Sequence, residues 1–80
     1  MGVMTGSTGV VVHIDESLDS NNREELLQKI EAINGVLSVD MQEQRPHLMI
    51  VDYNSNQTKS LDVLSGVNNS GVHAQLVGWV

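Results

Sequence analysis

Three histidines are the residues of this sequence that could most readily do chemistry, because imidazole nitrogens bind divalent ions such as Zn²⁺, Cu²⁺ and Ni²⁺. His13 lies near the end of a valine-rich run, His47 follows the one proline, and His73 lies in the last apolar segment. If these segments are neighbouring strands, the histidines and Asp15 can meet on one face of a sheet. We therefore predict a divalent transition metal as a candidate cofactor. Its ligands would be His13 and His73, with His47 as a possible third and Asp15 in support; alternatively, these side chains are only solvated on an exposed sheet.

The acidic segment DESLDSNN, which follows His13 and Ile14, is a second group that could hold a cation. It offers hard oxygen ligands, but it lacks the alternating acids and the closing glutamate of a calcium loop. Acids and amides also favour a helix N-terminus, so we expect Asn21 or Asn22 to cap a helix here. The chain has no cysteine, which excludes disulfides, thiolate nucleophiles and iron–sulfur sites. Because no nucleophile–base pair and no glycine-rich phosphate loop can be identified, we expect no enzymatic activity.

The charge of the chain limits the partners that it can bind. Four basic against ten acidic residues give a formal net charge of −6. Nucleic acids and anionic membranes are bound through clusters of Lys and Arg, so we expect neither as a partner. No apolar run approaches the roughly 18 residues of a membrane span, and the start of the chain lacks the features of a signal peptide. We therefore expect a soluble, cytoplasmic protein whose partner is a basic protein or a cation.

The length of 80 residues allows one small domain. Residues 1–9 are rich in Gly, Ser and Thr and are predicted to form a flexible leader, so that the domain covers residues 10–80. Runs of β-branched or alternating apolar residues predict four strands. These predicted strands cover residues 10–15, 36–42, 47–53 and 72–79.

Two segments have the spacing of helices packed by one face. Apolar residues recur at helical spacing between residues 22 and 33, and Gly35 is placed to end that helix. A weaker helix is predicted over residues 61–71, with Gly66 as an unfavourable interior residue. The candidate N-terminal caps of this second helix are Thr58 and Ser60.

The predicted order of elements is β-α-β-β-α-β. Because crossover connections are right-handed, both helices must cover the same side of the sheet. The sequence therefore predicts an α+β fold of the ferredoxin-like type, a four-stranded antiparallel sheet with two helices on one face. The other face of the sheet is left to solvent or to a partner.

Three short segments, INGV, VDYN and GVHAQL, occur in the order and spacing of the heavy-metal-associated domain, which the chain resembles over residues 10 to about 77. The resemblance implies the fold of soluble copper chaperones and of the N-terminal modules of metal ATPases. In that family a Met-Thr-Cys-x-x-Cys loop binds the metal through its two cysteines. Here Ser17 stands at the methionine, and Asp19 and Asn22 stand at the cysteines. A carboxylate and an amide are poor ligands for Cu(I), so the family's usual chemistry cannot be transferred to this loop.

Aliphatic residues on the strand face away from the predicted helices suggest a contact with another protein. Alternation places Val11, Leu48, Ile50 and Val77 on this face. We expect a protein partner or a homodimer to cover them. The predicted function is that of a non-enzymatic binding module without the cysteine site, linked to metal homeostasis, and the alternative is a histidine-based carrier of Zn, Cu(II) or Ni.

Overall fold

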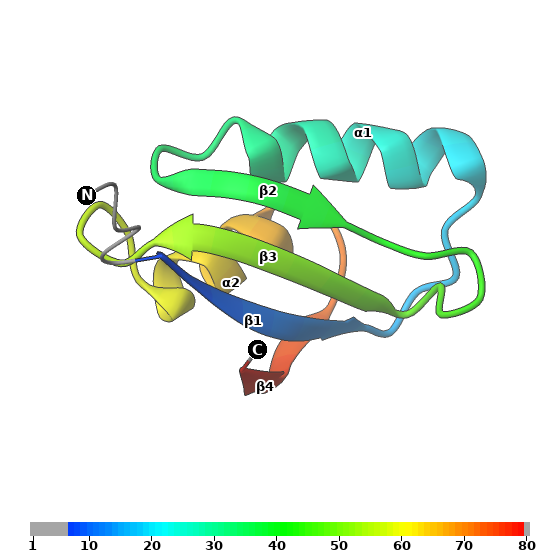
Figure 1. Cartoon of the computed structure of the whole chain (residues 1–80). Helices are drawn as coiled ribbons and strands as arrows, with labels where there is room; N and C mark the ends of the chain where they lie inside the picture. Colours follow the sequence, from blue (N-terminus) through cyan, green and yellow to red (C-terminus); the bar gives the residue numbers. More distant parts are fainter. Residues whose placement is uncertain (1–6, 80) are drawn as a thin grey trace.

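The structure is a computed structural model that describes residues 7–79. Its six elements follow the predicted order and are arranged as Figure 1 shows. They are β1 (Ser7–Ile14), α1 (Ser20–Glu31), β2 (Val36–Asp40), β3 (Leu48–Asn54), α2 (Ser60–Asn69) and β4 (Ala74–Trp79). Ser7, Thr8 and Gly9 belong to β1 and pair with β3, although the sequence assigned them to the leader. The rest of the predicted leader, residues 1–6, lies outside the described residues.

The four strands form one antiparallel sheet in the order β2-β3-β1-β4, which confirms the predicted ferredoxin-like fold. In Figure 1 the strands β2, β3 and β1 lie side by side, with α2 behind them. Strands β1 and β3 are central and are paired on both sides, whereas β2 and β4 are the edges. No helix of the described residues is long and apolar enough to cross a membrane.

Both edge strands are interrupted by a bulge. In β2 the register shifts between Val36 and Ser38, which leaves Leu37 as an extra residue opposite β3. In β4 the pairing passes from Leu76 to Gly78, which leaves Val77 as an extra residue opposite β1. Both extra residues are exposed, Leu37 by 52% and Val77 by 53%. A bulge of this kind bends the strand and breaks the regular ladder of hydrogen bonds.

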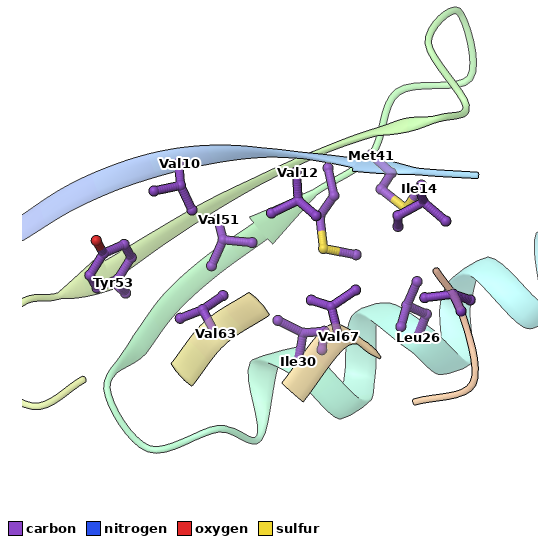
Figure 2. Close-up of a cluster of buried hydrophobic side chains, with 12 residues drawn as sticks. Val10, Val12, Ile14, Leu26, Ile30, Met41, Val51, Tyr53, Val63 and Val67 are labelled. Carbon is purple, nitrogen blue, oxygen red and sulfur yellow. The ribbon is translucent and has the colours of Figure 1, made fainter. Parts of the chain in front are cut away.

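The hydrophobic core lies between the sheet and the two helices. Alternate residues of β1 and β3, such as Val10, Val12 and Val51, point toward the helices and are fully buried (Figure 2). They pack against Ile30 of α1 and against valines of α2. Burying such a side chain contributes on the order of 1.5–3 kcal/mol. The alternation that fills the core therefore also directs the intervening residues to the other face.

The N-terminal cap of α1 is Asp19 rather than the predicted Asn21 or Asn22. Asp19 has an extended backbone, and its carboxylate Oδ1 accepts a hydrogen bond of 2.8 Å from the backbone N–H of Asn22. The helix thus begins at Ser20, which places Asn22 in its first turn. Aspartate is favoured at this position because its oxygen satisfies an N–H that has no partner within the helix.

Gly35 allows the chain to turn from α1 into β2, as predicted. Its φ angle is 97°, in the left-handed region that favours glycine. A Cβ atom at this position would also lie 3.0 Å from the Cβ of Gln57 and from the Cγ2 of Thr58. Thr58 is buried against this turn and does not cap α2; the cap residue is Lys59, which makes no side-chain capping bond. Both predicted caps of α2 were therefore wrong, since Ser60 is already within the helix.

Gly66 has a packing role in α2 that explains an otherwise unfavourable residue. A Cβ atom on Gly66 would lie 2.5 Å from Cδ1 of Ile33, which follows α1. The glycine therefore lets α2 approach the end of α1 closely enough for Ile33 to pack beside the core. This close approach offsets the loss of helix propensity, about 1 kcal/mol relative to alanine.

Candidate functional site

The outer face of the sheet, which we define as the face away from the two helices, carries a shallow apolar hollow. Val11 of β1 lies opposite Ile50 of β3, and His13 lies opposite Leu48. Val11, Leu48 and Ile50 are each only partly buried, and together they line a hollow of about 160 Å³. Of the four aliphatic residues predicted on this face, these three are brought together. Val77 is not among the lining residues, because the hollow lies on the side of β1 that pairs with β3, whereas Val77 belongs to the edge strand β4 on the other side.

The rim of the hollow is polar and comes from the end of β2 and the connection to β3. Asp40, Gln42 and Arg45 complete its lining. Asp40 lies opposite Ile50 in the sheet register, so its side chain shares the outer face. Asp52 lies on the same face, where its Oδ2 accepts a hydrogen bond of 3.0 Å from the hydroxyl of Ser38. An apolar centre with a polar rim is the composition typical of protein–protein contacts.

Two of the three histidines lie together beside this hollow. The rings of His13 and His47 are stacked, with their centroids 5.9 Å apart and their planes 20° apart. His47 Nδ1 lies 2.8 Å from the carbonyl oxygen of Ile14, and it must donate there because a carbonyl only accepts. His13 Nδ1 is buried and forms no hydrogen bond with any of residues 7–79; it lies 3.3 Å from Asp15 Oδ1, but not in hydrogen-bonding geometry.

The third histidine, His73, is engaged elsewhere and binds the segment between β1 and α1. Glu16 Oε1 accepts a 2.8 Å bond from the backbone N–H of His73, and Glu16 Oε2 lies 2.5 Å from His73 Nδ1. The backbone N–H of Asp15 also donates to the carbonyl of His73, at 2.9 Å. The hydrogen bond with Glu16 raises the pKa of His73, and the same bond lowers the pKa of Glu16. His73 is therefore part of a surface ion pair that fixes this loop to the start of β4.

The predicted metal ligands do not form one site in this arrangement. Among residues 7–79, no group of three His, Asp or Glu side chains is placed to hold a metal ion. The lone pair of an imidazole nitrogen lies in the plane of its ring, so the stacked rings of His13 and His47 direct their lone pairs side by side rather than toward one ion. A single ion bound by both would require one ring to turn.

The sequence analysis considered Glu16 only as part of the acidic segment and missed its pairing with His73, although a signal for this pairing was present. The register pairs His13 with Gln75 and Ile14 with Ala74, which carries the start of β4 toward the residues that follow β1. An antiparallel pairing of these two strands therefore places His73 near Asp15 and Glu16. The rim residues Gln42 and Arg45 carried no comparable signal, because their positions depend on the conformation of the connection between β2 and β3.

The position of the family's metal loop has a structural role in this chain. Asp19 and Asn22, which the resemblance aligns with the two cysteines, are joined by the capping bond of α1. This bond engages one oxygen of the Asp19 carboxylate in capping the helix. The loop is thus built to start a helix, which leaves the outer face as the candidate functional site.

Comparison with solved structures places the fold among heavy-metal-associated domains. A copper-binding domain from HMA7, a P-type ATPase, superposes with a TM-score of 0.82 at 14% identity, covering 90% of this chain and 96% of that one. The N-terminal domain of a potential copper-translocating P-type ATPase from Bacillus subtilis gives a TM-score of 0.81 at 16% identity, covering 92% and 91%. Oxidised MerP from Ralstonia metallidurans gives 0.77 at 14% identity, covering 88% and 96%.

At these identities the likeness establishes the fold alone. No family model matches the sequence, and no curated protein matches it. The structural neighbours confirm the fold that the sequence resemblance predicted, while the chain itself contains no cysteine.

Proposed function

We propose that this protein is a non-enzymatic, protein-binding module linked to metal homeostasis, and that it binds its partner through the outer face of the sheet. The observation that carries this proposal is the hollow lined by Val11, Leu48 and Ile50 on the sheet face opposite α1 and α2. Aliphatic side chains gathered around a hollow favour contact with a partner more than isolated exposed residues do. The link to metal homeostasis is supported by the fold, which this chain shares with copper-binding domains of P-type ATPases.

The edges of the sheet are less suited to binding than its face. A partner strand added to β2 or β4 would need a regular row of free N–H and C=O groups. The bulges at Leu37 and Val77 interrupt that row on both edges. The outer face, in contrast, is formed mainly by the two central strands. Their pairing is regular, with Val11 opposite Ile50 and His13 opposite Leu48.

A non-enzymatic role is supported by how the polar side chains are used. His73 and Glu16 bond to each other at the surface rather than facing a cavity. A second hollow, beside α1, includes Ser70 and Lys29 in its lining. The Ser70 hydroxyl donates to the carbonyl of Gly66 at 2.9 Å, as expected for a helix end rather than for a nucleophile.

The binding face can be tested by affinity capture with the full chain and matched variants. Ile50→Asp places a charge in the hollow, whereas Val11→Thr removes apolar character with almost no change of shape. Leu61→Asp is the control, because Leu61 is 67% exposed on α2 and away from the outer face. We expect a captured protein, once purified, to bind the wild type and Leu61→Asp equally in calorimetry and to bind both face variants at least tenfold more weakly. Equal binding by all four proteins would overturn the proposal.

The histidine-based carrier is the alternative function. Its predicted ligands are His13 and His73, with His47 as a possible third. Because the ring of His47 stacks on His13, this pair is tested first, as a site that forms when one ring turns. Calorimetric titration with Zn²⁺ and Cu²⁺ tests it. Micromolar binding that is lost in the double variant His13→Ala/His47→Ala would support the carrier. Binding that is weak, or unchanged in that variant, would remove it. The predicted cytoplasmic location rests on the sequence alone.

A further inference from the structure

The charges around the hollow indicate what kind of partner fits it. None of the four strands contains Lys or Arg, while β2 and β3 contribute Asp40 and Asp52 to the outer face. Within the described residues, neither carboxylate forms an ion pair. Among the residues that the structure describes, Arg45 is the one basic residue that lines the hollow. The face therefore combines an aliphatic centre with two carboxylates that have no ion-pair partner among the described residues.

We propose that the partner is a basic protein surface that inserts an apolar side chain into the hollow and places Lys or Arg against Asp40 and Asp52. This inference rests on the proposed function and specifies its partner. Complementary charge steers association and excludes partners of the same sign. Asp40 is exposed and Asp52 is half-buried, so both can be reached by the long side chain of a lysine or an arginine without a change in the sheet.

A second copy of this chain fits the same face less well. In a twofold dimer the same patch meets itself, so four aspartates and two copies of Arg45 would come together. Each copy also brings a net charge of −6. Like charges that are brought together across an interface oppose association. Charge thus favours a basic partner over a homodimer.

A selection with a randomised peptide library identifies the preferred chemistry without a known partner. The library is selected on the immobilised full chain, and peptides that also bind Ile50→Asp are removed. We expect the retained peptides to combine Lys or Arg with large apolar residues. Neutral or acidic peptides among the binders, or no binders that depend on Ile50, would overturn the inference.

The role of the two aspartates is then measured with one selected peptide. The variant Asp40→Asn/Asp52→Asn removes both charges with little change of shape, and Asp62→Asn on the exposed side of α2 is the matched control. We expect each aspartate to contribute about two- to fivefold in affinity, as an exposed ion pair does, and we expect added salt to weaken binding to the wild type. The control should bind as the wild type does.

The outcomes separate this inference from the proposed function. If Ile50→Asp abolishes binding while the double asparagine variant binds normally, the face is an interaction site but its partner is not recognised by charge. If light scattering over a concentration series shows a dimer that Ile50→Asp dissociates, a second copy is the occupant and the inference is wrong. If Ile50→Asp and wild type behave alike with every partner, both proposals fail.

Discussion

At the scale of single residues, the pairing of His73 with Glu16 is the contact that should respond to pH. Glu16 accepts a hydrogen bond from the backbone N–H of His73 and also contacts the imidazole of His73. The negative carboxylate of Glu16 and the protonated imidazole of His73 therefore stabilise each other. Both side chains lie at the surface, and His73 is 82% exposed, so solvent screens their attraction. The pair therefore fastens a loop locally and adds only a little to the stability of the whole domain.

We expect the ion pair to stabilise the fold most between pH 4.5 and 6.5, the ordinary pKa values of the two groups. The pKa of His73 is raised, so its contribution is complete below 6.5 and is lost as pH rises through the higher folded value. The pKa of Glu16 is lowered, so its contribution is present above 4.5 and is lost as pH falls through the lower folded value. Urea unfolding of wild type and Glu16→Gln within, below and above this pH range measures the difference.

An NMR titration of the His73 ring gives the direct control for this prediction. Glu16→Gln keeps an oxygen that can accept from the His73 backbone but removes the negative charge. The pKa of His73 should fall toward its ordinary value in this variant. If the titration of His73 is the same in both proteins, the ion pair does not form in solution.

At the scale of secondary-structure elements, the contact between Gly66 and Ile33 determines how closely α2 meets the end of α1. We expect Gly66→Ala to gain helix propensity but to lose packing against Ile33 Cδ1, so that the two effects largely cancel. In an Ile33→Val background, which lacks this methyl group, the same change should be more favourable by about 0.5–1.5 kcal/mol. A double-mutant cycle in urea unfolding measures this coupling.

The matched control for the cycle is Ser65→Ala, an exposed position next to Gly66 in α2. It changes helix propensity by a few tenths of a kcal/mol without a new contact, so it should have the same effect in both backgrounds. If Gly66→Ala, like Ser65→Ala, changes the free energy of unfolding by the same amount with Ile or Val at position 33, the glycine is not needed for packing.

The sequence predicted the elements and their pairing because these follow from patterns spread over many residues. Alternation in β1 and β3 separated the core valines from Val11 and Ile50, and this separation specified the register of the sheet. The caps were less predictable because each depends on one side chain. Asp19 and Asn22 are both good caps three residues apart, and the observed bond uses the side chain of the first and the backbone of the second.

The same contrast, between patterns spread over many residues and contacts made by one side chain, applies to the candidate site. The aliphatic residues of its centre follow from alternation, whereas the placement of the histidines depends on loops. His47 was expected to be a secondary ligand, yet it is the ring that stacks on His13, since the connection after β2 carries it next to the end of β1. His73 binds Glu16 because this acid lies within reach of both its backbone and its ring. These contacts depend on side-chain geometry, which a periodic sequence pattern does not encode.

At the scale of the whole molecule, the sheet should be most stable at its centre. Strands β1 and β3 are hydrogen-bonded on both sides and fill the core, so the amides of Val10, Val12 and Val51 should exchange most slowly with solvent. The amides of Leu37 and Val77 should be among the fastest of the strand residues, because each lies in a bulge of an edge strand. Hydrogen exchange followed by NMR at two pH values tests this order. Equal protection of edge and central strands would contradict it.

The two bulges also have a consequence for the behaviour of the protein in crowded solution. A sheet with straight edges can be extended by another molecule, strand upon strand, into a continuous fibre. Here each edge is bent at an exposed aliphatic residue, Leu37 on one side and Val77 on the other, so an incoming strand would lose alignment after a few residues. The protein can therefore expose the aliphatic residues of its outer face while its edges resist polymerisation.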